Sequence, residues 1–130
     1  MQNQTIRYLH LFPSHDTPEG VSFSMVEYAW TSFNKGAKIY RKSSTDLNRI
    51  HPTQKPIALY DWIIKNYAKP NDKILDTHLG SGSIAIAVDK ANKINNMNLQ
   101  FTGIELDKDY YNSMINRFEN YKSQLILNLI

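Results

Sequence analysis

Apolar residues in the middle of the chain recur with the period of a helix. The segment after Pro56 carries large apolar residues at i, i+3, i+4 and i+7, which is one helix face: Tyr60, Ile63, Ile64 and Tyr67. Pro56 suits the first turn of this helix, because a first-turn N–H has no partner within the helix. We therefore expect a helix after Pro56 that stops at residues 69–72, where Lys-Pro-Asn-Asp breaks the pattern.

A glycine-containing turn follows. Residues 73–76 (KILD) predict a short strand, and Gly80 and Gly82 with Ser81 between them predict a turn. Residues 83–91 then predict a helix with one apolar side, formed by Ile84, Ala87, Val88 and Ala91.

The next strand and helix complete a repeating unit. Residues 99–105 (LQFTGIE) predict a strand, and Asp107 is a suitable N-cap for a long helix. Its inward residues are predicted to be Tyr111, Met114, Ile115 and Phe118. Strand, turn, helix, strand and helix form a βαβα unit, so we expect two parallel strands joined by a right-handed crossover.

The first part of the chain has a strand pattern. Residues 5–12 are rich in β-branched and aromatic types and end at a proline, and residues 21–33 predict a second strand. Residues 37–41 follow a turn in which Gly36 would supply a positive φ. This pattern predicts an antiparallel hairpin. The apolar end of the chain, residues 125–130, predicts a third strand or a contact with another chain.

Length and composition fit one globular domain of 130 residues, with 42% hydrophobic and 21% charged residues. We expect a strand and hairpin region in residues 1–42 and the βαβα half in residues 51–124. There is no apolar run of membrane-spanning length, no signal-peptide pattern and no cysteine, which favours the cytoplasm. A net charge of +3 and a pI of about 9.1 are compatible with an acidic partner such as DNA.

Two acidic residues are placed at the predicted strand ends. Asp76 precedes the glycine turn and suits a ligand with an ammonium group, while Glu105 ends the next strand, where carboxylates bind ribose hydroxyls. This combination favours S-adenosylmethionine over NAD, whose fingerprint has a third glycine that is lacking here. From these residues alone, a tight turn with helix-capping acids stays an equal alternative for Gly80 and Gly82.

Longer blocks of sequence narrow the choice. The run HPTQKP (residues 51–56), the run ILDTHLGSGSIAIA (residues 74–87) and the run FTGIELDKDYYNSMINRF (residues 101–118) occur in this order, preceded by EYAWTSFNKGAKIYR (residues 27–41). Over residues 21–124 the chain resembles prokaryotic and phage DNA amino-methyltransferases, of the permuted class with C-terminal cofactor motifs. The resemblance implies an α/β fold: the Rossmann-like fold of S-adenosylmethionine-dependent methyltransferases, here with an incomplete sheet and an antiparallel hairpin.

The resemblance also implies roles for individual residues in binding S-adenosylmethionine. Asp76 would bind the methionine ammonium group, Gly80 and Gly82 would form the pocket floor, and Glu105 would bind the ribose hydroxyls. The remaining implied residues are Thr53 and Lys55, at the methionine carboxylate, and Asp107, at the next helix start. His51 and His78 are expected to be packing or turn residues, and no metal site is expected.

The motif that catalyses methyl transfer in this family is lacking. That motif has an Asp, Asn or Ser followed by two prolines and an aromatic residue, and it holds the flipped target base. No two prolines are adjacent in this chain. The resemblance therefore implies no catalytic residue here and a chain that is inactive alone. Loss of that strand would also leave unpaired sheet edges.

Three functions remain open: a methyltransferase part complemented by another chain, a binding module for cofactor or DNA without catalysis, and a structural oligomer. The unpaired edges and the apolar end favour association, with a complementing chain or a second copy. Adenine is the expected target base, as for the relatives that the chain resembles. Lys35, Lys38 and Arg41 are candidate DNA contacts, in a basic strip that continues with Lys42, Arg49 and Lys55. A solvated strand edge is an equal alternative for that strip.

Overall fold

The computed structural model describes residues 9–11, 29–41, 50–51 and 54–127. The chain divides into two compact units, Met1–Ile39 and Tyr40–Ile130, and each is considered by itself.

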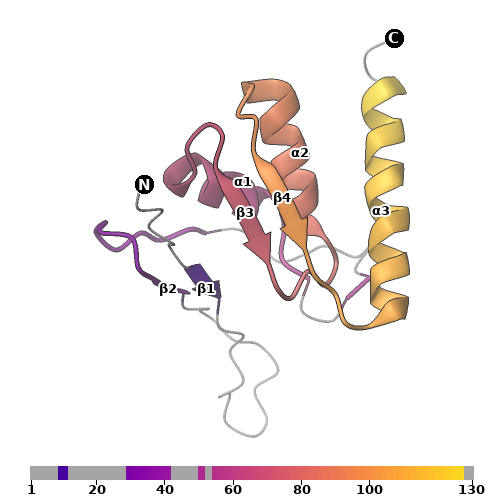
Figure 1. Ribbon diagram of the computed structural model, residues 1–130, viewed down its shortest axis with the longest axis horizontal. Coiled ribbons are helices and arrows are strands. Elements are labelled where there is room, and N and C mark those ends of the chain that lie inside the picture. Colours follow the sequence, from indigo (N-terminus) through magenta and orange to yellow (C-terminus); the bar gives the residue numbers. More distant parts are fainter. Residues whose placement is uncertain (1–8, 12–28, 42–49, 52–53, 128–130) are drawn as a thin grey trace, which may run out of the picture. The chain divides into compact units, whose positions relative to one another are not determined.

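The first unit contains a short antiparallel pair. Strand β1 (Leu9–Leu11) pairs with β2 (Ala29–Thr31), and Leu9 lies opposite Thr31 (Figure 1). Residues 5–8, 12 and 21–28 of the two predicted strands lie outside the described residues.

The hairpin predicted around Gly36 is wrong in its position. Residues 37–41 form no strand, and Gly36 does not have a positive φ. After β2, the hydroxyl of Thr31 accepts a hydrogen bond from the Phe33 N–H at 3.1 Å, and the Phe33 carbonyl accepts one from the Lys35 N–H at 2.9 Å. These local bonds use backbone groups that a strand ladder would need, so the antiparallel partner of β2 is β1 instead.

The second unit begins with helix α1 (Ile57–Tyr67), which confirms the predicted helix. Pro56 precedes its first turn in an extended conformation, and the Ala68 N–H bonds to the Ile64 carbonyl at the end of the helix. Ile64 is buried, and the other three residues of the predicted face are half-buried.

Strands β3 (Lys73–Asp76) and β4 (Gln100–Gly103) pair in parallel, as predicted, with Asp76 opposite Gly103. In both strands, half-buried and exposed residues alternate. Ile74 and Phe101 face the helices, whereas Leu75 is 62% exposed on the opposite face.

Helix α2 (Ser83–Asn95) connects these strands and is four residues longer than predicted. It ends at Asn96, whose left-handed conformation stops the helix. Figure 1 shows α1 and α2 behind the strand pair. The core between these helices and the strands contains Ile64, Ala87, Val88 and Leu99.

Helix α3 (Lys108–Leu127) begins as predicted. The Asp107 carboxylate caps it by accepting hydrogen bonds from the N–H groups of Asp109 and Tyr110, at 2.8 and 2.9 Å. Met114 is buried, but Tyr111 and Ile115 are exposed, contrary to the predicted inward face. Residues 125–127 continue the helix, so the third strand predicted there is wrong for these residues. None of the helices in the described ranges is both long and apolar enough to cross a membrane.

Candidate functional site

The candidate site lies where β3 and β4 end. Beyond the last strand pairs, the Ile104 N–H donates to the Asp76 carbonyl at 2.8 Å, and the Leu79 N–H donates to the Ile104 carbonyl at 3.0 Å. The carboxylate of Asp76, which is half-buried as a residue, accepts an exposed hydrogen bond from the His78 N–H at 2.9 Å. The backbone that follows each strand is therefore fixed to its neighbour.

The turn after β3 requires glycine at two positions. Gly80 and Gly82 have φ values of +52° and +71°, a region that other residues rarely adopt. A methyl group at Gly82 would also overlap the side chain of Met114. Because the turn approaches α3 so closely, both the backbone angle and the available space exclude a larger residue there.

Glu105 fastens this turn to the end of β4. Its carboxylate accepts hydrogen bonds from the N–H of Gly80 at 2.8 Å and from the N–H of Asp107 at 3.0 Å. The bond from Asp107 is the main cause of a lowered pKa for Glu105, which burial partly offsets and to which Gly80 and the nearby His51 add smaller effects. Glu105 is therefore ionised at neutral pH.

His51 covers the turn from the other side. Its ring lies 3.7 Å from where a Gly80 methyl would be, and 4.3 Å from the Tyr110 ring between centroids. Gln54, which is 8% exposed, holds this segment by donating its N–H to the His51 carbonyl and accepting the Ile50 N–H with its side chain. The prediction of a packing or turn role for His51 is consistent with these contacts.

Protein groups surround the start of α2. The Ser83 hydroxyl donates to the Lys55 carbonyl at 2.7 Å, and Arg117 of α3 donates to the Ser81 carbonyl and the Ser83 hydroxyl. Ser83 is only 2% exposed.

The structure brings together most of the residues predicted for cofactor binding. Asp76, Gly80 and Glu105 lie in one network with Gly82 and Asp107. The backbone of Lys55 reaches the start of α2. Thr53 lies outside the described residues, as do Lys42 and Arg49 of the basic strip. Lys35 and Lys38 belong to the first unit and Arg41 to the second, and all three are exposed.

Sequence reasoning missed two residues near the turn. Leu106 follows Glu105 and is 99% exposed, which is unusual for a leucine and could have been suspected from its place between two acidic residues. Arg117 bonds to a residue 36 positions away, and no local pattern signals such a contact.

Comparison with known proteins identifies the family. Residues 4–117, most of the chain, match the DNA methylase family. The chain belongs to this family. This match confirms the resemblance seen in the sequence blocks, and the α/β structure of the described residues, with its parallel strand pair, agrees with an incomplete Rossmann-like sheet.

Individual relatives match parts of this chain. It is 34% identical over 64 residues to YubD of Escherichia coli (strain K12), named as a methylase, covering 49% of this chain and 26% of YubD. It is 36% identical over 61 residues to the type II methyltransferase M.BglII of Bacillus subtilis, covering 47% of this chain and 15% of that protein. Among solved structures, the crystal structure of the M1.HpyAVI–SAM complex matches with a TM-score of 0.48 and 36% sequence identity. The match covers 65% of this chain and 42% of the other chain. The chain thus spans less than half of each of these proteins.

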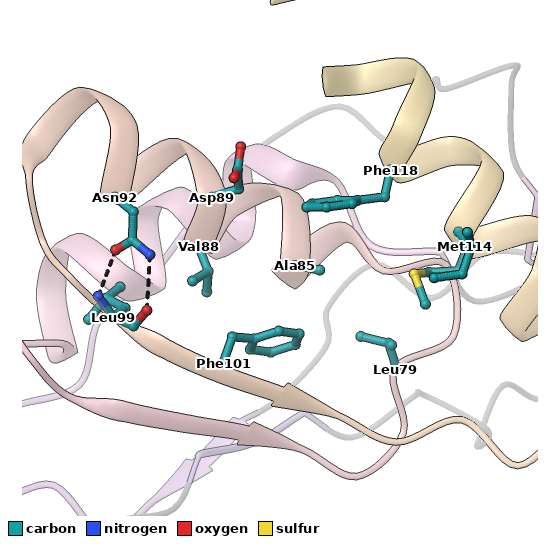
Figure 2. Close-up of a pocket in the computed structure, with 10 residues that line it drawn as sticks. Leu79, Ala85, Val88, Asp89, Asn92, Leu99, Phe101, Met114 and Phe118 are labelled. Carbon is teal, nitrogen blue, oxygen red and sulfur yellow. Dashed lines mark hydrogen bonds between the residues drawn. The ribbon is translucent and has the colours of Figure 1, made fainter. Parts of the chain in front are cut away.

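A pocket of about 310 Å³ lies between α2, α3 and β4. Figure 2 shows its apolar side chains, which come from α2, β4, α3 and the turn, among them Val88, Phe101 and Met114. Asp76, Gly80 and Glu105 do not line it. This pocket is therefore a gap in helix packing and does not belong to the candidate site. Among the residues that the structure describes, no group of three His, Cys, Asp or Glu side chains could hold a metal ion.

Proposed function

We propose that this chain binds S-adenosylmethionine at the ends of β3 and β4 and is the cofactor-binding part of a DNA amino-methyltransferase. The observation that carries the proposal is the position of Glu105, which is held by the Gly80 and Asp107 N–H groups beside the half-buried Asp76. Two fixed carboxylates beside a glycine turn match a ligand that has both an ammonium group and a ribose.

The residues present fit such a ligand. A carboxylate can accept about four hydrogen bonds, and Glu105 uses two for backbone N–H groups, so it retains acceptors for ribose hydroxyls. Asp76 accepts one bond from the His78 N–H and retains acceptors for the methionine ammonium group. Gly80 and Gly82 would form the floor of the pocket.

Neighbouring residues would complete the contacts. Lys55, with Thr53, would bind the methionine carboxylate, and Asp107 would lie near the ribose. The exposed side chain of Leu106 would contact the adenine base, because burying a leucine against a flat ring is favourable.

The division of chemistry follows from these roles. Bound S-adenosylmethionine supplies an activated methyl group on its sulfonium. The chain's own residues bind and orient it, and none of them is assigned to the transfer, because the Pro-Pro-aromatic motif is lacking. We infer that transfer, with adenine in DNA as the acceptor, requires that motif from a complementing chain.

The start of α2 argues against a dinucleotide ligand. A Rossmann dinucleotide site places the pyrophosphate at a helix N-terminus. Here Ser83 is buried and bonded to the Lys55 carbonyl and to Arg117. The Ser83 hydroxyl is therefore already bonded to protein groups at the place where a dinucleotide site would bind the pyrophosphate.

A calorimetric titration with S-adenosylmethionine tests the proposal. We expect saturable binding to the parent chain, at least about tenfold weaker binding to Asp76→Asn, because an amide lacks the charge that attracts ammonium, and unchanged binding to Glu119→Gln. Glu119 is an exposed carboxylate on α3, so the control removes the same charge elsewhere. No binding by the folded parent chain would refute the proposal.

A second experiment tests the inferred need for a partner. The chain is incubated with labelled S-adenosylmethionine, DNA and a methyltransferase fragment that carries the Pro-Pro-aromatic motif. We expect methylated adenine only with both chains present. Cofactor binding without product would favour the alternative of a non-catalytic binding module, for which Lys35, Lys38 and Arg41 are the candidate DNA contacts. A structural oligomer would bind no cofactor.

A further inference from the structure

Arg117 connects the third helix to the glycine turn. Its Nη1 donates to the Ser81 carbonyl at 2.7 Å and to the Ser83 hydroxyl at 3.0 Å. Ser81 lies between the two positive-φ glycines, so this bond fixes the carbonyl at the centre of the turn. The two acceptors lie 36 and 34 positions before Arg117 in the chain.

The same hydroxyl links a third segment. Ser83 donates to the Lys55 carbonyl at 2.7 Å, and its oxygen lies 3.2 Å from the Ser81 hydroxyl. Arg117, the start of α2 and the segment before α1 therefore form one hydrogen-bonded unit. Both segments that Arg117 joins are proposed to bind the ligand, one through the glycine turn and the other through Lys55.

Two more residues of α3 press on the turn from the same helix face. Met114, one turn before Arg117, packs beneath Gly82, and the ring of Tyr110, one turn earlier, contacts the tilted ring of His51, which covers Gly80. Residues spaced by four and three positions share a helix face. Tyr110, Met114 and Arg117 thus form one helix face, and each of them contacts the turn or the residue that covers it.

Electrostatic attraction does not explain why Arg117 lies beside the start of α2. A helix N-terminus carries partial positive charge, so a cation beside the start of α2 is electrostatically unfavourable. Arg117 must therefore act through the directed hydrogen bonds of its guanidinium, which supplies several donors in a fixed geometry.

We propose that Arg117 is a positioning residue of the cofactor site. It holds the Ser81 carbonyl, and through it the turn, in the orientation in which the Gly80 N–H bonds to Glu105 and the glycines face the ligand. The inference rests on the proposed function for the identity of that ligand, S-adenosylmethionine. The effect of Arg117 on the turn itself is independent of the ligand.

The test combines backbone amide NMR with calorimetry on the full chain. Arg117→Met keeps the side-chain length and removes the donors, and Lys122→Met removes one charge from the same helix farther from the turn. In Arg117→Met we expect the Gly80 and Gly82 amide resonances to shift, while the resonance of Leu99, which precedes β4 and bonds to Asn92 of α2, stays unchanged. We expect S-adenosylmethionine affinity to fall about tenfold or more, since hydrogen bonds from charged groups are lost. Lys122→Met should match the parent in both measurements.

Several outcomes decide the matter. Unshifted glycine resonances in a folded Arg117→Met, or parent-like cofactor affinity, would overturn the role of Arg117. If the parent chain binds no cofactor, the proposed function fails, and the resonances alone decide whether Arg117 positions the turn. If Arg117→Met does not fold, Arg117→Lys, which keeps the charge and some donors, replaces it. In Arg117→Lys, shifted Gly80 and Gly82 resonances together with weaker S-adenosylmethionine binding would support the positioning role of Arg117. Parent-like resonances and parent-like affinity would contradict it.

Discussion

The backbone N–H of Gly80 donates a 2.8 Å hydrogen bond to the carboxylate of Glu105, 25 positions later in the chain. This bond joins the turn after β3 to the end of β4. With the second bond from the Asp107 N–H, it fixes a carboxylate whose pKa is lowered. The site and the local stability of the strand ends are thus coupled through a single titratable group.

Glu105 should make stability depend on pH in the acid range. Its folded-state pKa is lowered below the usual value of 4.5, so its contribution to the free energy of unfolding is present above that value and is lost as the pH falls through the lower folded pKa. The contribution is small because the carboxylate is solvent-accessible. Glu105→Gln should flatten the dependence of the unfolding midpoint on pH below about pH 5, as followed by urea unfolding.

The matched control for that measurement is Glu119→Gln. Glu119 forms a 3.1 Å ion pair with Lys122 on the exposed side of α3, away from the turn. An acid profile that Glu119→Gln changes as much as Glu105→Gln does would contradict the assignment of this effect to the bonds from Gly80 and Asp107.

Gly82→Ala should destabilise the second unit strongly. The new methyl group meets a φ of +71°, which disfavours alanine by about 1–2 kcal/mol, and overlap with Met114 adds about 1–3 kcal/mol. We expect a loss of roughly 2–5 kcal/mol in the free energy of unfolding, measured by denaturant titration. In the double variant Gly82→Ala/Met114→Ala, the overlap is relieved. The losses of the two single variants should therefore sum to more than the loss measured for the double variant.

Gly36→Ala is the control for the glycine change. Gly36 has no positive φ, and nothing lies within 4 Å of the position that a methyl group would take. Its effect should stay within about 0.5 kcal/mol. Equal losses at Gly36 and Gly82 would mean that the tight approach of α3 to the turn is absent in solution.

The elements of the second unit could be predicted because their signals are local. The alternation in KILD, the helix spacing after Pro56 and the Asp107 cap each involve a few neighbouring residues, and all three predictions are confirmed. The meeting of Asp76 and Glu105 at one sheet edge followed from parallel pairing, which the structure also shows.

The errors involve contacts between distant segments. The turn residues around Gly36 predict a hairpin there, but β2 pairs with β1, about 20 residues earlier. After β2, the Thr31 hydroxyl accepts the Phe33 N–H, which a second strand would need for its ladder. The end of α2 was predicted too early because its last turn is held by Asn92 and Leu99 across the following loop. Arg117 was overlooked for the same reason.

Asn92 should contribute substantially to the stability of the α2–β4 connection. Its side chain accepts the Leu99 N–H at 2.6 Å and donates to the Leu99 carbonyl at 2.9 Å, as Figure 2 shows. Leu99 is buried, so Asn92→Ala would leave two backbone groups unpaired, at about 1–3 kcal/mol each. We expect a loss of about 2 kcal/mol or more in chemical unfolding.

Two variants separate this effect from a change in helix propensity. Asn92→Asp keeps the acceptor for the Leu99 N–H and loses the donor, so its loss should be intermediate. Asn95→Ala alters an exposed residue of the same helix and should change stability by less than about 0.5 kcal/mol. A similar loss for Asn95→Ala and Asn92→Ala would show that the paired bonds to Leu99 contribute nothing.

The hydroxyl of Tyr121 on α3 should lose its proton only at an unusually high pH. Burial, and then the negative charges of Asp89 and Asp61, raise the pKa of its hydroxyl from 10.0 to about 12. Both carboxylates belong to ion pairs, with Lys93 at 2.7 Å and Lys90 at 2.6 Å. A phenolate next to these acids is unfavourable, so the folded state keeps Tyr121 protonated over a pH range in which the unfolded chain releases the proton.

The difference between the folded-state and unfolded-state pKa of Tyr121 determines how stability changes with pH. A raised folded-state pKa stabilises the fold fully below the unfolded value near 10, and this contribution is lost as the pH rises toward about 12. Other tyrosines and lysines titrate in the same range, so the informative quantity is the difference in unfolding midpoint between the parent and Tyr121→Phe. We expect the parent to lose more stability over this range than the variant, and Tyr111→Phe, at a 44% exposed position, to behave as the parent. Parallel alkaline profiles for the parent and Tyr121→Phe would mean that the hydroxyl is hydrated in solution and that α3 does not pack against Asp89 and Asp61.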